Sequence, residues 1–341
     1  EIAKKKIFKS IDHANLNSIK IIKEAFENVK ERIGRRPMLM DFITQNSIDP
    51  KVIISKFNNY YLFLKKYNYI GKIFRKDAVK NLTFLSKELL PGLKKSDYEV
   101  LENMIKGNDY SLKSEDDMKT SLNILSLNYF GKNEKERYGS PIVDPNTKRL
   151  SKTFSEYLKD KDYRSFVFDI LNLAKYYNEK IQNSGNDLIL YNQYTRLDFL
   201  KLVNWRNDKK NMANNIYGYR VLDEYIPLFI TYHKSEDIDD SIKYEDHFLN
   251  QEELAWVSRK NVSLKNKEIN QIINHKEDGK TIYIFVKKND SEGSQHYYLG
   301  EAEYMKGSAN ETTNVTEDKI VTMNFIMKTP IRDDIYRYLV N

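Results

Sequence analysis

The chain has 341 residues and a formal net charge of +7, and 40% of its residues are hydrophobic, which is enough apolar material for folded cores. It contains no cysteine, which excludes disulfides and thiolate metal sites and favours a reducing, cytoplasmic location. No apolar stretch approaches the roughly 20 residues that a membrane-spanning helix needs. The length predicts two or three domains, and because the first residue is Glu1 we expect the numbering to begin inside a longer protein.

The charge is unevenly distributed along the chain. Residues 186–341 carry 21 lysines and arginines against 25 aspartates and glutamates, a net of −4, whereas residues 1–185 carry 35 against 24, a net of +11. Such asymmetry is typical of a protein that neutralises nucleic-acid phosphates. A chain that is merely rich in surface lysine gives the same count, so charge alone leaves both interpretations open.

The first half of the chain has the periodicity of helices. Apolar residues recur at spacings of three and four from Ile19 to Val29, and Gly34 and Pro37 end that helix before another begins within 38–44. Further helices are predicted at 49–68, 76–89, 96–107, 115–128 and 162–182. The sequence NSGND (183–187) breaks this pattern, so we place a domain boundary there and predict an all-α domain over 1–185.

Residues 186–341 have a different composition. Short β-branched and aromatic runs predict strands at 226–232, 281–286, 297–304 and 320–327, and short helices are expected at 252–256 and 265–274. Strands with interspersed helices predict an α+β domain with a curled sheet or a small barrel.

No catalytic motif is complete. The ending of a phosphate-binding loop occurs at Gly279-Lys280-Thr281 without the glycine that should precede it, and the five histidines are scattered without metal-ligand spacing. There is no nucleophile elbow and no cysteine nucleophile. Glu301, Glu303 and Lys306 loosely match the acidic pair and lysine of metal-dependent nucleases, but a charged strand edge has the same pattern. We therefore predict no catalytic residue and no metal site here.

The stretch 216–259 combines aromatic, basic and acidic residues. Inspection of a single base requires lifting it from the stack, and aromatic faces then replace the lost stacking, worth about 1–3 kcal/mol per base. A carboxylate can accept from the cytosine N4 amine. The predicted base pocket consists of Tyr219, Tyr232, Asp240, Tyr244, Asp246 and Trp256, with Asp237 and Asp239 as alternative carboxylates. The predicted contacts to the DNA backbone are Arg220, Lys234, Lys243, Arg259, Lys287 and Lys288. The alternative is that these aromatics are core residues, which is the commoner role in strands.

Several motifs in order resemble one bacterial family. They are GRRPMLMDF (34–42), NSIDP (46–50), TRLDFLKLVNW (195–205), IYGYR (216–220), PLFITYHKSEDI (227–238), KYEDHFLNQEELAWVSR (243–259) and IFVKKNDSEGSQHYYLG (284–300). The chain resembles the C-terminal region of type IV modification-dependent restriction enzymes that carry phospholipase D-like nuclease and helicase domains. The resemblance covers nearly the whole sequence.

The resemblance implies a division of labour. Residues 1–185 would be a helical coupling domain, and 186–341 an SRA- or PUA-like domain that flips 5-methylcytosine or 5-hydroxymethylcytosine out of duplex DNA. Nuclease and helicase domains of the same polypeptide would supply catalysis with ATP and magnesium, while this region would need no cofactor. The chain could also form a homodimer, and the resemblance leaves this question open. Three other interpretations remain: a metal-dependent nuclease, an RNA-binding PUA-like module and a coupling scaffold that reads no base.

Overall fold

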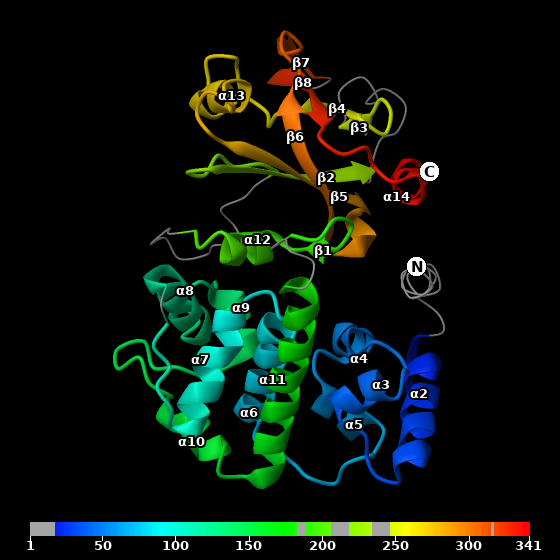
Figure 1. Ribbon diagram of the computed structural model, residues 1–341, viewed down its shortest axis with the longest axis vertical. Coiled ribbons are helices and arrows are strands. Elements are labelled where there is room, and N and C mark those ends of the chain that lie inside the picture. Colours follow the sequence, from blue (N-terminus) through cyan, green and yellow to red (C-terminus); the bar gives the residue numbers. More distant parts are fainter. Residues whose placement is uncertain (1–17, 113, 183–187, 206–217, 234–245, 315–316) are drawn as a thin grey trace. The chain divides into compact units, whose positions relative to one another are not determined.

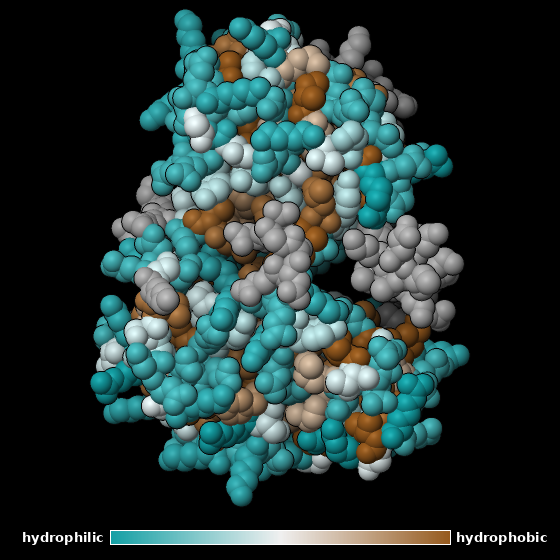
Figure 2. All heavy atoms as spheres, in the orientation of Figure 1, coloured by the Kyte–Doolittle hydropathy of each residue, from teal (hydrophilic) through white to brown (hydrophobic). Residues whose placement is uncertain are grey.

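The computed structural model describes residues 18–112, 114–182, 188–205, 218–233, 246–314 and 317–341. By internal packing the chain divides into two units, Glu1–Gly185 and Asn186–Asn341 (Figure 1). Hydrophilic side chains cover most of the face of each unit that is seen in Figure 2. Among the described residues, no helix has the length and apolar content needed to cross a membrane.

The first unit is helical where it is described, as the periodicity predicts. Its α-helices are α2 (Ser18–Ile33), α3 (Leu39–Thr44), α4 (Pro50–Phe57), α5 (Tyr60–Lys66), α6 (Lys76–Phe84), α7 (Lys95–Lys106), α8 (Glu115–Leu125), α9 (Lys132–Tyr138), α10 (Lys152–Tyr157) and α11 (Lys161–Gln182). A π-helical turn, Leu85–Leu89, continues α6. In α2 the buried residues Ile22, Ala25, Phe26 and Val29 lie on one face, as their spacing requires.

The single helix predicted over 49–68 is wrong. The structure has two helices there, α4 and α5, separated by Asn58 and Asn59. Asn58 has φ of 65°, a left-handed conformation that ends a helix, and the Asn59 side chain caps the next one by accepting from the Leu62 N–H at 2.8 Å. The apolar spacing continues through this corner, so periodicity alone could not show it.

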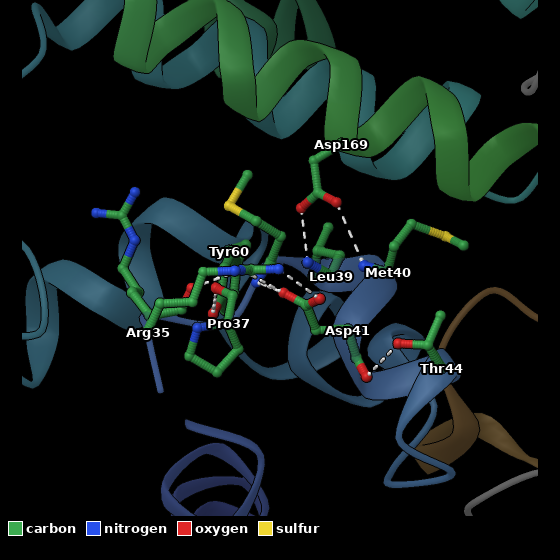
Figure 3. Close-up of polar contacts among 10 residues, drawn as sticks. Arg35, Pro37, Leu39, Met40, Asp41, Thr44, Tyr60 and Asp169 are labelled. Carbon is green, nitrogen blue, oxygen red and sulfur yellow. Dashed lines mark hydrogen bonds and ion pairs between the residues drawn. The ribbon is translucent and has the colours of Figure 1, made fainter. Parts of the chain in front are cut away.

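Asp169 of α11 holds the start of α3. Its Oδ2 accepts from the Leu39 N–H at 2.6 Å and its Oδ1 from the Met40 N–H at 3.3 Å. Figure 3 shows this carboxylate reaching from α11 to the first turn of α3, beside the Arg35–Asp41 ion pair. Burial raises the pKa of Asp169 to about 6, although the two N–H donors oppose that rise.

This pKa predicts a pH-dependent stability of the first unit. The pKa of Asp169 in the folded state lies above the usual value of about 3.9. Its protonated carboxyl therefore stabilises the fold at low pH, fully below about pH 3.9. This stabilisation is lost as the pH rises through about 6. When the pH is lowered from 7.5 to 4.5, the free energy of unfolding of wild type should therefore rise by about 2 kcal/mol relative to that of Asp169→Asn. Hydrogen exchange of α3 peptides measures it, and a pH-independent difference would contradict the assignment.

The second unit is built on a mixed sheet. Its strands are β1 (Gln193–Tyr194), β2 (Tyr225–His233), β3 (His247–Phe248), β4 (Glu253–Val257), β5 (Thr281–Asn289), β6 (His296–Tyr304), β7 (Asn310–Thr313) and β8 (Lys319–Met327). Strands β2 and β5 are parallel, and the other pairs are antiparallel. Strands β2, β5, β6 and β8 confirm the predicted runs, but the helix predicted at 252–256 is wrong because this segment is β4, paired with β8.

Among the described strands the sheet is not closed. Its hydrogen-bonded order runs β2-β5-β6-β8-β4-β3, with β1 beside β6 and β7 beside β8, so of the two predicted forms, a curled sheet or a small barrel, these strands do not form a closed barrel (Figure 1). The α-helices of this unit are, among the described residues, α12 (Arg196–Leu202), α13 (Lys267–Ile273) and α14 (Asp333–Val340), and a 3-10 turn spans Asp290–Glu292. Phe199 of α12 packs on Phe285, whereas Tyr338 of α14 packs on Tyr297. Tyr297 and Tyr298 are successive residues of β6, so their side chains point to opposite faces of the sheet. Tyr298 contacts Phe285, which is on the α12 side, so α12 and α14 cover opposite faces.

Candidate nucleic-acid interface

The two ends of the sheet meet through aromatic side chains. Tyr219, which pairs with Leu228 of β2, packs edge to face on Trp256 of β4 with ring centroids 5.0 Å apart. Tyr232 of β2 stacks on Phe248 of β3 at 5.7 Å. We call these four aromatic residues, Tyr219, Tyr232, Phe248 and Trp256, the seam. The sheet curls until β2 faces β3 and β4 across the seam, without a hydrogen-bonded strand pair between them among the described residues.

All four seam rings are buried. Tyr219 is 2% exposed, Trp256 3%, Phe248 6% and Tyr232 9%. Burial raises the pKa of Tyr219 and of Tyr232, because the phenolate form loses its hydration there. The seam is therefore packed in this structure, and a base could enter only if these side chains separate.

Arg259 places a cation against the seam. The centre of its guanidinium lies 4.1 Å from the Tyr219 ring centroid, and Nη2 bonds the Tyr219 carbonyl oxygen at 3.2 Å and the Glu268 carboxylate at 2.8 Å. Its Nε is buried and has no hydrogen-bond partner among the described residues. A buried N–H donor without an acceptor costs the free energy of its lost hydration. The Arg259 Nε–H could recover this cost by donating a hydrogen bond to a ligand.

Asp246 supports the backbone of the seam. Its Oδ1 accepts from the Val257 N–H at 2.9 Å, which ties the start of β3 to the end of β4 beside Trp256. Asp246 as a whole residue is 7% exposed. Nearby, the Phe248 N–H points to the Tyr232 hydroxyl at 3.4 Å, a long contact that joins β3 to β2.

The structure thus gathers five of the predicted residues, Tyr219, Tyr232, Asp246, Trp256 and Arg259. Arg220 follows Tyr219, and its N–H lies 3.4 Å from the Pro227 carbonyl oxygen. Lys287 and Lys288 make other contacts. Lys287 is buried and bonds Asp290 and the Gly293 carbonyl oxygen, each at 2.9 Å, while the Lys288 ammonium lies 5.0 Å from the Tyr338 ring centroid. Outside the described residues lie Lys234, Asp237, Asp239, Asp240, Lys243 and Tyr244.

A buried histidine was not singled out from the sequence. His296 at the start of β6 is 1% exposed, its Nδ1 lies 3.2 Å from the Ser294 carbonyl oxygen, and its ring packs edge to face on Phe229. Burial, and then the charges of Arg196 and Lys287, lower the pKa of His296 to about 3. Strand alternation could have placed His296 inside, but no sequence pattern brings Arg196 beside it.

The carboxylates of the nuclease alternative lie in separate ion pairs. Glu301 pairs with Lys328 at 2.7 Å and Glu303 with Lys276 at 2.5 Å. Within the described parts of the chain, no three metal-ligating side chains come together.

Two family models match the chain, each over less than half of it. Residues 22–183 match a domain of unknown function, DUF8090, and residues 188–339 match another, DUF3427. A search of curated protein sequences gives no match to the chain.

Solved structures that are similar to the chain include SRA domains. A complex of the SUVH5 SRA domain with fully methylated CG DNA has 9% identity and a TM-score of 0.29, covering 42% of this chain and 92% of that one. The DNA modification-dependent restriction endonuclease AspBHI has 11% identity and a TM-score of 0.29, covering 45% and 80%. Arabidopsis thaliana SUVH6 has 11% identity and a TM-score of 0.30, covering 76% and 41%. These TM-scores are below 0.5, so the similarity carries no conclusion about a ligand.

Proposed function

We propose that residues 186–341 bind duplex DNA that contains 5-methylcytosine or 5-hydroxymethylcytosine, and that the modified base is flipped into the seam. The observation that carries this proposal is that Tyr219, Tyr232, Asp246, Trp256 and Arg259, which are predicted together from the stretch 216–259, lie along one seam of the fold. Aromatic rings replace the stacking that a flipped base loses, and an arginine supplies hydrogen-bond donors.

Discrimination of the methyl group follows from apolar burial. A methyl group adds no hydrogen bond, and its burial contributes roughly 0.8 kcal/mol, or about a fourfold difference in affinity. In this proposal the Arg259 Nε–H, which is buried without a hydrogen-bond partner among the described residues, donates to an acceptor of the base or of its phosphate. Entry of the base requires Tyr232 and Phe248 to separate, because both rings are buried in contact with each other.

The wider assignment rests on the sequence resemblance. We propose that the chain is the substrate-recognition region of a type IV restriction enzyme and that 186–341 adopts an SRA-like fold. In this proposal residues 1–185 couple recognition to nuclease and helicase domains, which use ATP and magnesium. Recognition, and not catalysis, is then the contribution of the residues described here.

Arg259 gives the sharpest test of the seam. Arg259→Ala should weaken binding to a methylated duplex by about tenfold or more, because a good hydrogen-bonded contact to a base contributes about 1–3 kcal/mol. Fluorescence anisotropy with the full chain measures the affinity, and circular dichroism checks that the variant folds.

A matched control is available in the same unit. Arg332 also lies over a tyrosine ring, 4.7 Å from the centroid of Tyr191, and pairs with Asp334. Arg332→Ala should leave the affinity within about twofold of wild type, since exposed ion pairs contribute little. If both variants bind the methylated duplex equally well, Arg259 does not belong to the site.

A further inference from the structure

Lysines converge on an aromatic pair at the corner between α4 and α5. The Lys23 ammonium lies 4.8 Å from the Tyr67 ring centroid, and the Lys66 ammonium lies 5.8 Å from it and 5.5 Å from the Phe57 centroid. Phe57 and Tyr67 pack edge to face, and Lys56 precedes Phe57 in α4. Lys23, Lys56 and Lys66 are all exposed, and we call these three residues the lysine corner.

The nearby carboxylates already have other partners. Glu24 pairs with Lys20, Glu27 with Lys30 and Asp41 with Arg35. Asp49 caps α4 and accepts from the Tyr177 hydroxyl. Among the described residues, no carboxylate lies within ion-pair distance of the lysine corner.

The charge around the lysine corner is positive as a whole. Residues 18–74 carry 11 lysines and arginines against 5 aspartates and glutamates. The Lys23 and Lys66 ammonium groups both lie over the Tyr67 ring, and exposed Lys56 lies in the last turn of the neighbouring helix α4. Like charges in one region without ion-pair partners attract a polyanion, and duplex DNA carries one negative charge per roughly 1.7 Å of its axis. Exposed Asn58 and Asn68 lie in the same segments, and their side-chain amides can donate to phosphate oxygens.

We propose that the lysine corner binds the backbone phosphates of duplex DNA, whatever the modification of the bases. Residues 186–341 have a net charge of −4 and attract DNA poorly, so a second contact on the basic first unit would supply affinity that the reader domain lacks. This contact positions DNA without reading its sequence. The choice of DNA as its ligand rests on the proposed function, whereas the contact itself involves no residue of the seam.

The test is a triple variant, Lys23→Gln, Lys56→Gln and Lys66→Gln, in the full chain. Its affinity should fall by about tenfold or more at about 0.1 M salt, equally for methylated and unmethylated duplexes of the same sequence. The slope of log affinity against log salt concentration should become shallower by about 2–3, because each lost phosphate contact removes about 0.9. The ratio of methylated to unmethylated affinity should not change.

A control triple variant removes the same charge elsewhere in the first unit. Lys95, Lys106 and Lys159 are exposed and each pairs with a glutamate one helical turn away, namely Glu99, Glu102 and Glu156. Their change to glutamine should leave the salt slope nearly unchanged. Equal losses of DNA affinity in both triple variants would overturn the proposal. So would an unchanged salt slope in the lysine-corner variant, which is the result expected if the lysine corner binds an acidic protein instead of DNA. A wild-type chain without methyl preference would refute the seam and leave this result intact.

Discussion

Trp256→Ala is expected to destabilise the second unit by about 3–5 kcal/mol. Trp256 is 3% exposed and fills the space between Tyr219 and Phe325, with ring centroids 5.0 and 5.8 Å away. Alanine would leave a cavity at the point where β4 closes on Tyr219, and the surrounding backbone can collapse only partly. Hydrogen exchange of peptides from β4 and β8 measures this loss in the full chain.

Trp205→Ala is the control for Trp256→Ala, because Trp205, which follows α12, is only half-buried and its loss should destabilise the unit much less. A cost below about 1 kcal/mol at Trp256 would contradict its role in the packing of the sheet. The result also bears on the base pocket. Because loss of Trp256 impairs folding, its part in DNA binding must be measured in Trp256→Phe, which keeps an aromatic ring at the seam.

Acid should destabilise the second unit through His296. Its folded-state pKa of about 3 lies below the usual value near 6.5, so His296 contributes stability above pH 6.5, and that stability is lost as pH falls towards 3. The expected loss is about 2 kcal/mol at pH 5 and about 3 kcal/mol at pH 4. Protonation would place a third positive charge beside Arg196 and Lys287 in a buried site.

His296→Asn should remove this acid sensitivity. The free energy of unfolding at pH 7.5 and pH 5 is measured by urea titration, with hydrogen exchange of β6 peptides as the probe of unfolding. His275→Asn is the control. His275 is also buried and bonds the Lys280 carbonyl oxygen and the Tyr304 N–H, but its replacement leaves His296 in place. An imidazole of His296 that titrates near pH 6.5 by NMR would show that the assignment is wrong.

The sequence predicts most long elements of this fold because their apolar spacing is strong. Helices α2, α7 and α11 and strands β2, β5, β6 and β8 lie where the pattern places them. The helix predicted at 252–256 is wrong because pairing with β8, which local sequence does not reveal, makes Glu253–Val257 a strand. The corner at Asn58 depends on a backbone conformation that apolar spacing does not reveal.

The candidate site was predictable only in part. Local composition identified Tyr219, Tyr232, Asp246, Trp256 and Arg259 as a group, but it could not show that the rings lie buried where two sheet ends meet. The contacts of the predicted cations depend on residues that lie elsewhere in the sequence. Lys287 bonds the β5–β6 connection, and Arg259 bonds Glu268, so neither cation extends freely into solvent. The lysine corner brings together helices whose contacts do not follow from sequence spacing.

The most direct test of the central proposal is the affinity of the full chain for matched duplexes that carry cytosine or 5-methylcytosine in varied flanking contexts, measured by fluorescence anisotropy at near-physiological salt. We expect the methylated duplex to bind at least about fourfold more tightly in some context, because the seam buries the methyl group. Equal affinities in every context would contradict a modified-base reader and would leave the chain as a DNA-binding module that does not distinguish bases.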